Sequence, residues 1–131
     1  MNNQDIKADA GKPQLTLVPR RIIFDIARVR EYGLKKYGEK ESWKKVEIER
    51  YRDATFRHFM AYLNNPQGVD AESGLPHLWH LACNVAFLCE LEAEKSKKAE
   101  KEEAFLQHLR EEYEFLRRNP CEVTITPLKN P

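Results

Sequence analysis

The sequence has few of the residues that hold small secreted or metal-bound domains together. It contains only three cysteines, Cys83, Cys89 and Cys121, and none of them forms a CxxC spacing. Any disulfide would leave one thiol over, so we interpret all three as reduced thiols of a cytoplasmic protein. This pattern disfavours disulfide scaffolds and zinc fingers.

The sequence also lacks long hydrophobic runs. No apolar stretch approaches the ~20 residues that span a bilayer, and the polar segment 1–12 has no apolar region of a secretory signal. Hydrophobic residues make up 41% of the chain and charged residues 33%, and the mean hydropathy is -0.72. This composition is typical of a soluble, helix-rich protein, and 131 residues suit a single domain.

Charge is distributed unevenly although the net charge is only +1. Residues 1–58 carry 14 Lys and Arg against 9 Asp and Glu, whereas residues 59–131 carry 8 against 12. A modest basic excess in one half favours small anions such as phosphates over duplex nucleic acid, which usually requires a strong overall basic excess. The alternative is that these charges only solvate helix surfaces.

Hydrophobic periodicity predicts a mainly helical fold. Gly33 and Gly38 indicate a helix end followed by a turn, and Ser73 is a candidate N-cap. The C-terminal helix either continues from residue 77 or breaks near Ser96 and Lys97 and turns back. The segments with helical spacing are 19–32, 47–63, 77–92 and 103–118.

We therefore expect an all-α fold, a compact bundle of four or more helices. Alternating apolar and polar residues allow a minor two-stranded β element from residues 15–17 and 123–126. The single domain, residues 1–131, is expected to consist of an extended arm (1–14), a core (15–92), and a charged C-terminal helix and tail (93–131).

The most apolar helix, residues 77–91, carries a polar stripe. His77, His80 and Asn84 are spaced i, i+3 and i+7, so they lie on one face of a helix that is otherwise apolar nearly all round. Each residue alone is readily explained as a hydrogen-bonded core side chain. Three aligned polar groups in a buried helix instead indicate the wall of a pocket, because buried polar groups need partners.

The preceding helix carries a matching stripe of Arg50, Asp53 and Arg57, with His58 next to it. This arrangement is either a surface ion-pair ladder or, if it faces the histidine stripe, a phosphate and metal site. We predict that the two stripes face each other across one pocket. Asp70 and Glu72 lie in the loop between the helices, where they are either Mg²⁺ ligands or ordinary loop carboxylates.

Two further segments add cations and aromatic rings. The arm supplies Lys7, Asp9 and Lys12 around a glycine, although the GxxxxGK[ST] phosphate-binding pattern is absent. Lys36 and Tyr37 lie in a loop-like segment before Trp43. The rings would either stack on a nucleotide base or pack in the core.

These motifs occur together in a recognisable order: KADAGKPQLTLVP, YGLKKYG, a following Trp, RYRDATFRH and DAESGLPHLWHLACNVAFL. The combination resembles the N-terminal domain of phage-associated dATP/dGTP diphosphohydrolases, a group loosely related to the MazG-like, all-α nucleotide pyrophosphohydrolases. The resemblance covers about residues 7–92. One departure is that the EExxE and ExxD metal-binding motifs of MazG-like enzymes are absent, and RDATFRH and HLWH stand in the comparable helices.

The resemblance implies Mg²⁺-dependent cleavage, with Mn²⁺ as a possible substitute, of a purine deoxynucleoside triphosphate to the monophosphate and pyrophosphate. For a phage protein this reaction would take place in the host cytoplasm. The site residues that it implies are Lys7, Asp9, Lys12, Lys36, Tyr37, Asp53, Arg57, His58, Asp70, His77, His80 and Asn84.

In the expected mechanism, Asp53 with Asp70 or Glu72 holds Mg²⁺, and Arg57 neutralises charge on the phosphates. His77 or His80 is the candidate base. Lys7, Asp9, Lys12, Lys36, Tyr37, His58 and Asn84 are expected to bind substrate.

Two other functions remain open. A non-catalytic phage protein that sequesters a nucleotide second messenger of host defence would need the same cations and rings but no metal carboxylates. An interaction module would use the charged C-terminal helix as an assembly surface. In each case we expect a homo-oligomer, a dimer or tetramer, because the apolar helix 77–91 needs more cover than three short helices provide.

Overall fold

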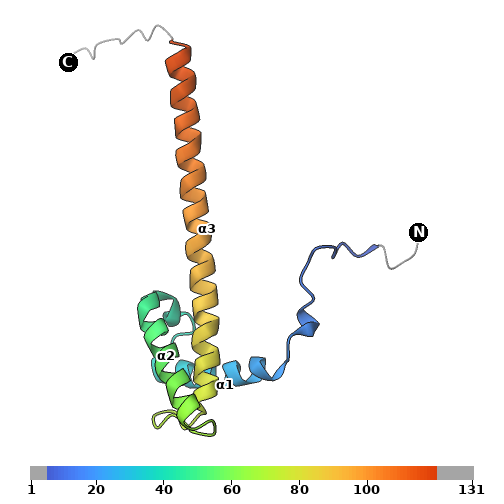
Figure 1. The fold of residues 1–131 in the computed structure, drawn as a ribbon, viewed down its shortest axis with the longest axis vertical. Coiled ribbons are helices and arrows are strands. Elements are labelled where there is room, and N and C mark those ends of the chain that lie inside the picture. Colours follow the sequence, from blue (N-terminus) through green and yellow to red (C-terminus); the bar gives the residue numbers. More distant parts are fainter. Residues whose placement is uncertain (1–5, 121–131) are drawn as a thin grey trace, which may run out of the picture. The chain divides into compact units, whose positions relative to one another are not determined.

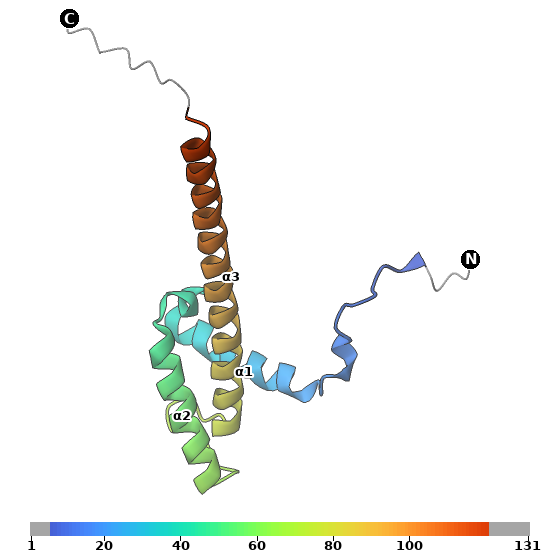
Figure 2. The same cartoon turned by 45° about the horizontal axis from the view of Figure 1, so that its top comes forward.

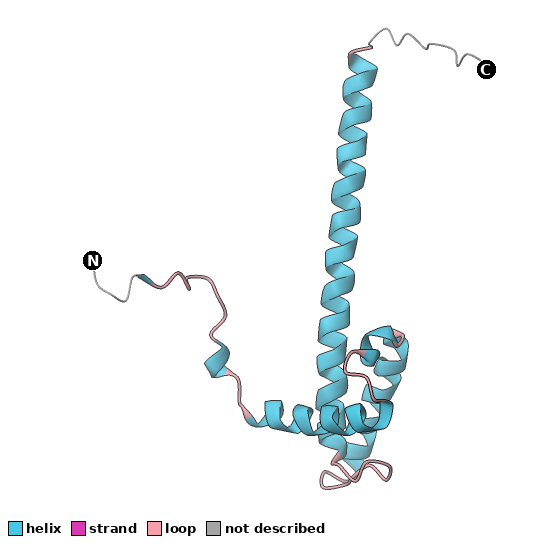
Figure 3. Cartoon of the chain, turned by 180° about the vertical axis from the view of Figure 1, so that it is seen from behind, coloured by secondary structure: helices cyan, strands magenta, loops and turns pink. Residues whose placement is uncertain are grey.

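The structure is a computed structural model that describes residues 6–120. Every regular element in this range is helical, which confirms the all-α prediction (Figure 3). There are three α-helices in place of the four or more expected: α1 (Arg21–Tyr37), α2 (Ile48–Asn64) and α3 (His77–Arg118). Two short 3-10 helices, Leu15–Leu17 and Ser42–Lys45, precede α1 and α2.

Helix α1 is one turn longer than predicted. Gly33 lies inside it, and the helix ends at Gly38, whose backbone has φ 71° and whose N–H donates to the Leu34 carbonyl at 2.8 Å. A positive φ at the residue after the helix is the usual role of glycine in helix termination. The predicted helix end at Gly33 is therefore wrong, because a single interior glycine costs only about 1 kcal/mol.

Helix α2 agrees with the predicted range 47–63 to within one residue at each end. The following loop folds back on itself before α3. Val69 and Pro76 form an isolated antiparallel bridge, and the Asp70 N–H donates to the Leu75 carbonyl at 2.8 Å. This closure brings the loop carboxylates close to the start of α3.

The predicted strand at residues 15–17 is wrong, because Leu15–Leu17 is a 3-10 helix whose two leucines are exposed. An isolated strand gains no ladder hydrogen bonds, so a three-residue alternation is too short to determine its structure. The second predicted strand, residues 123–126, lies outside the described residues.

Helix α3 continues without a break from His77 to Arg118 (Figure 1). The turn near Ser96 and Lys97 does not occur, because residues 92–103 consist almost entirely of Glu, Lys and Ala, which are strong helix formers. Residues 77–92 and 103–118 thus belong to one helix, which is the first of the two alternatives and leaves three α-helices in place of four. The chain divides into two compact units, residues 1–89 and 90–131, and each is described by itself.

The first unit contains α1, α2 and the first turns of α3. Both views place α2 alongside these first turns (Figures 1 and 2). Its core is small: Val29 and Cys83 are the buried hydrophobic residues described in this unit. The expectation that helix 77–91 is buried on nearly all sides is wrong for the isolated chain, since Leu78 and Val85 are 43% and 42% exposed.

The second unit, as far as it is described, is the remainder of α3. Its larger apolar side chains are all exposed, apart from Leu91 near its start. Across residues 6–120, no helix combines the length and apolarity that crossing a lipid bilayer requires. The exposed apolar side chains of this unit are Phe105, Leu106, Leu109, Tyr113, Phe115 and Leu116.

Candidate functional site

The first unit contains a pocket of about 560 Å³ that all three helices line. Arg50, Asp53 and Arg57 of α2 lie on its wall together with His80 and Asn84 of α3. The prediction that the two polar stripes face one pocket is confirmed for these five residues but not for His77, which does not line it. The pocket volume falls within the range of roughly 300–1,000 Å³ that is usual for small-molecule sites.

Three histidines contact one another at this site, and two of them, His58 and His80, line the pocket. His58 Nδ1 lies 2.9 Å from His77 Nδ1, and the His58 ring stacks on the His80 ring with centroids 4.8 Å apart. Burial is the main reason that the pKa of His58 falls to about 4, and the positive charge that His80 and His77 would carry lowers it further. Burial likewise lowers the pKa of His80. His58 and His80 are therefore neutral at pH 7, as a metal ligand or a proton acceptor must be.

The loop before α3 holds a carboxylate and a hydroxyl in place. Asp70 Oδ1 accepts N–H bonds from Glu72 at 3.1 Å and Ser73 at 2.9 Å. Burial opposes ionisation of Asp70, but the Ser73 N–H bond and the nearby His80 outweigh it and lower the pKa. The loop thus presents an ionised, oriented carboxylate.

Ser73 does not cap α3 as predicted. Its Oγ instead accepts the Leu75 N–H at 3.1 Å and lies 2.6 Å from His80 Nε2. Because the loop closes on itself, the hydroxyl reaches a side chain one turn inside α3 and not the first backbone N–H groups. Ser73 consequently fixes the orientation of the His80 ring.

Cations also line the pocket. Arg50 and Arg57 are exposed on α2, and Lys36 of α1 forms an ion pair with Glu72. The hydrogen bond from Lys36 is the main cause of the lowered pKa of Glu72, and the same bond raises the pKa of Lys36. The Glu72 carboxylate is thus held in an ion pair with Lys36.

An aromatic cluster of Trp43, Tyr51 and Phe87 also lines the pocket. Trp43 stacks on Phe87 with centroids 4.5 Å apart, and the Tyr51 hydroxyl donates to the Trp43 carbonyl at 2.7 Å. The Arg30 guanidinium lies over Phe87, 5.2 Å from the ring centroid. One face of Trp43 is therefore used in packing, whereas Tyr37 is 65% exposed at the pocket wall.

The structure does not bring every predicted residue to this pocket. Lys7, Asp9 and Lys12 are exposed on the arm and do not line it. The arm bonds to itself, with the Lys12 N–H donating to the Asp9 carbonyl at 3.0 Å. The predicted site residues that do line the pocket are Lys36, Tyr37, Asp53, Arg57, His58, Asp70, Glu72, His80 and Asn84.

Sequence reasoning missed Arg30, Tyr32 and the role of Ser73. Tyr32 bonds to Glu72, and Arg30 bonds to the Lys40 carbonyl and covers the aromatic cluster. Treating α1 as continuous to Gly38 would have placed Arg30, Gly33 and Tyr37 on one helix face at i, i+3 and i+7. No comparable signal in the sequence connects Ser73 with His80.

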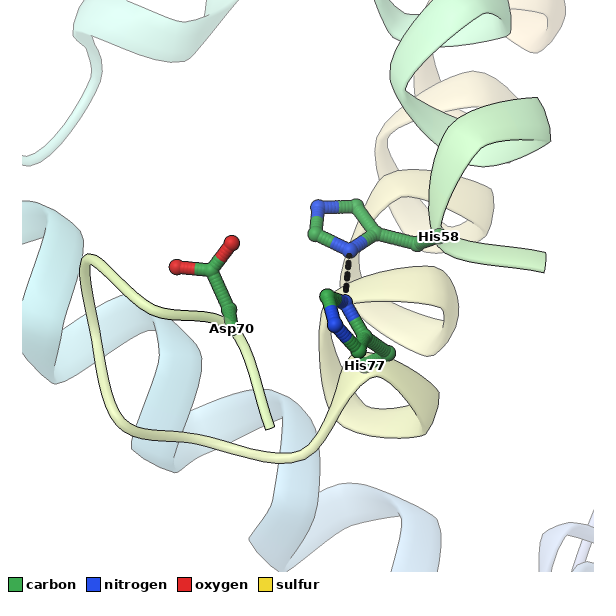
Figure 4. Close-up of side chains that lie close together, drawn as sticks. All are labelled: His58, Asp70 and His77. Atoms are coloured by element: carbon green, nitrogen blue, oxygen red, sulfur yellow. Dashed lines mark hydrogen bonds between the residues drawn. The ribbon is translucent and has the colours of Figure 1, made fainter. Parts of the chain in front are cut away.

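The carboxylates proposed to bind metal are not gathered into one ligand set. Asp53, Asp70 and Glu72 all lie on the pocket wall, yet they do not form a metal-sized group among the described residues. The group that does form is His58, Asp70 and His77, with ligand atoms all within 4.8 Å of one another (Figure 4). An all-oxygen Mg²⁺ site of three carboxylates does not fit this arrangement.

Comparison with known proteins assigns the chain to a protein family. Residues 2–102 match the family model described as dATP/dGTP diphosphohydrolase, N-terminal. The chain belongs to this family. It is also 39% identical over 83 residues to a protein of Salmonella phage PMBT28 named dATP/dGTP diphosphohydrolase.

The aligned segment covers 63% of this chain but only 28% of that relative. The family match contains the whole pocket, since every lining residue lies between Val29 and Phe87. No solved structure matches the chain.

Proposed function

We propose that the chain binds a purine deoxynucleoside triphosphate in the pocket of its first unit and hydrolyses it to the monophosphate and pyrophosphate. The observation that carries this proposal is the composition of the pocket wall. Arg50, Arg57 and Lys36 line the same cavity as the neutral imidazoles His58 and His80. The name of the phage relative supports a deoxynucleoside triphosphate as the substrate class.

The cations account for phosphate recognition. Arg50 and Arg57 lie two turns apart on α2, so both guanidinium groups can approach one polyphosphate chain. Guanidinium groups bind phosphate oxygens through paired N–H donors and stabilise the charge that develops during phosphoryl transfer. Lys36 would join them on exchanging Glu72 for a phosphate oxygen.

His80 is the residue we assign to proton transfer. Its Nε2 faces Ser73 Oγ at 2.6 Å, and with the ring proton on Nε2 its Nδ1 keeps a lone pair. That lone pair would accept a proton from water as the water oxygen bonds to the α-phosphorus. The bond between the α-phosphorus and its bridging oxygen then breaks, and pyrophosphate leaves with the electron pair.

We also expect the reaction to require a divalent cation, Mg²⁺ or Mn²⁺. Asp70 is the carboxylate best placed for it, because Glu72 is paired with Lys36 and Asp53 stands apart from the ligand group. The set of Asp53, Asp70 and Glu72 does not form a Mg²⁺ site among the described residues.

The test is product analysis with the intact chain. Each deoxynucleoside triphosphate is incubated with the protein and with Mg²⁺ or Mn²⁺, and the products are separated by chromatography. We expect pyrophosphate and the monophosphate from dATP or dGTP, and loss of turnover in His80→Asn. Exposed His108, which lies in the second unit, provides the matched control variant His108→Asn.

Sequestration of a nucleotide without cleavage is the second candidate. It is favoured by the absence of the EExxE and ExxD motifs and by the scattered carboxylates of the pocket. Under this function, nucleotide binds tightly without metal, no pyrophosphate is released from any triphosphate, and Asp53→Asn leaves affinity unchanged or improves it. Under hydrolysis, pyrophosphate is released from dATP or dGTP, and His80→Asn is expected to lower turnover while the fold is retained.

A further inference from the structure

The cluster of His58, Asp70 and His77 combines residues from three different segments. His58 comes from α2, Asp70 from the loop, and His77 is the first residue of α3 (Figure 4). Folding thus brings two imidazole nitrogens and a carboxylate oxygen within 4.8 Å of one another. From this geometry we propose that the three side chains bind a first-row transition-metal dication of the zinc class in preference to Mg²⁺.

The spacing of the two imidazoles fits a shared metal ion. Metal–nitrogen bonds of about 2.0–2.1 Å separate two ligand nitrogens by roughly 2.9 Å at a right angle and 3.4 Å at a tetrahedral angle. The observed Nδ1–Nδ1 distance is 2.9 Å. An ion can therefore enter between the two rings with little movement of α2 or α3.

The ring protons of His58 and His77 can be arranged so that both Nδ1 atoms bind the metal ion. In the metal-free protein one Nδ1 carries the proton of the His58–His77 hydrogen bond, and the other accepts it. When the ion binds, that proton leaves Nδ1 and solvent supplies one to Nε2 of the same ring. Each ring then offers an Nδ1 lone pair to the ion, and this exchange releases no net proton.

Asp70 is held in place independently of any ion. Its Oδ1 accepts the Glu72 and Ser73 N–H groups, so the loop backbone fixes the carboxylate beside the two rings. A ligand oriented by outer hydrogen bonds is typical of metal sites in proteins. The His80 ring is held by Ser73 and stacks on the His58 ring. This stacking restricts the orientation of His58.

The donor types determine the class of ion. Two imidazoles and one carboxylate suit zinc, iron, cobalt or nickel, whereas Mg²⁺ requires oxygen ligands in near-ideal octahedral geometry. Three protein ligands also leave a coordination position open. His58 and Asp70 line the pocket, so that position would be close to the bound phosphates.

This inference rests on the proposed function, because it assigns a metal ion to the same site. Its test nevertheless requires no nucleotide. The untagged chain is stripped with EDTA, dialysed, and titrated by calorimetry with Zn²⁺ and separately with Mg²⁺. We expect one Zn²⁺ per chain and an affinity at least about 100-fold higher than for Mg²⁺. Equal affinity for the two ions, or no Zn²⁺ binding, would overturn the assignment.

Variants locate the site. We expect His77→Gln and Asp70→Asn each to lower Zn²⁺ affinity at least about 100-fold, since even outer-shell changes cost 10- to 100-fold. Asn at position 70 can still accept the loop N–H bonds, so this variant should keep the fold, which circular dichroism checks. His108→Gln, an exposed histidine in the second unit, should leave affinity unchanged. Unaltered Zn²⁺ binding in a folded Asp70→Asn variant would show that the ion binds elsewhere.

Cobalt separates this site from the cysteines. A His₂Asp site gives visible d–d bands without an intense sulfur-to-metal charge-transfer band, whereas Cys83, Cys89 or Cys121 would produce that band. A charge-transfer spectrum would contradict the proposal. If metal binds as described but no triphosphate is cleaved, the metal site stands and the hydrolytic function fails.

Discussion

The two units of this chain use their charged residues in different ways. In residues 1–89, polar side chains interrupt apolar helix faces and converge on one pocket. In residues 90–118, charged side chains pair within their own helix, as Arg110 does with Glu103 and Arg117 with Glu114. Such exposed pairs contribute little to stability and create no site.

The difference shows where sequence patterns carry functional information. On a helix that is polar on most sides, a charged side chain such as that of Arg110 is satisfied by water and needs no protein partner. A histidine or asparagine on an apolar helix requires a partner, because burial without one is costly. His80 and Asn84 are of the second kind, and both lie at the pocket.

The largest expected effect comes from placing a charge in the core of the first unit. Cys83 is 2% exposed, and burial raises the pKa of its thiol to about 11. We expect Cys83→Lys to lower the free energy of unfolding by about 3 kcal/mol or more, because the ammonium would be buried near Arg30.

Cys89 is exposed on the same helix and provides the control. Cys89→Lys should change the free energy of unfolding by less than about 0.5 kcal/mol. Urea denaturation followed by circular dichroism measures both variants. Similar midpoints for the two would contradict the distinction between the buried and the exposed position.

The next effect concerns anion binding. Arg57→Ala should weaken nucleotide affinity by ~1.5–3 kcal/mol, or roughly 10- to 100-fold, because a charged hydrogen-bond donor to phosphate is lost. Arg110→Ala removes the same charge from the second unit and should leave affinity unchanged. Calorimetric titration with dGTP compares the two, and equal losses would indicate nonspecific attraction by net charge.

A smaller effect is expected for self-association through the second unit. The exposed stripe Phe105, Leu109, Tyr113 and Leu116 follows one helix face and is our candidate surface for the proposed homo-oligomer. Leu109→Lys should weaken association at least about tenfold while nucleotide binding persists, since burying a leucine contributes about 1.5–3 kcal/mol.

Gln107→Lys lies on the opposite side of the same helix and should not change association. Sedimentation equilibrium measures parent and variants over a range of concentrations. A parent protein that stays monomeric at millimolar concentration would rule out this surface as an oligomer contact.

The smallest effect is expected from single hydroxyl groups. Ser73→Ala removes the contacts to His80 Nε2 and the Leu75 N–H and should lower the free energy of unfolding by about 1 kcal/mol. Ser96→Ala, exposed on α3, should be neutral or slightly stabilising because alanine favours the helix. A Ser73 variant as stable as the Ser96 variant would mean that the loop does not depend on this hydroxyl.

Several features followed from local sequence alone. Helical periodicity predicted α2 to within a residue, and the i, i+3, i+7 spacing predicted that Asp53, Arg57, His80 and Asn84 share one pocket. Helix ends were less predictable. Gly33 and the segment around Ser96 resemble helix terminators, but the strong helix formers around them continue α1 and α3.

Tertiary structure decided which polar groups meet. Periodicity fixes the face on which a side chain lies, because the helix repeat is local. It does not fix how the loop at residues 65–76 closes, and that closure brings Asp70 to His58 and His77, pairs Ser73 with His80, and lets Lys36 engage Glu72. These contacts join residues up to 36 positions apart, so they depend on packing between helices, which no short sequence window contains.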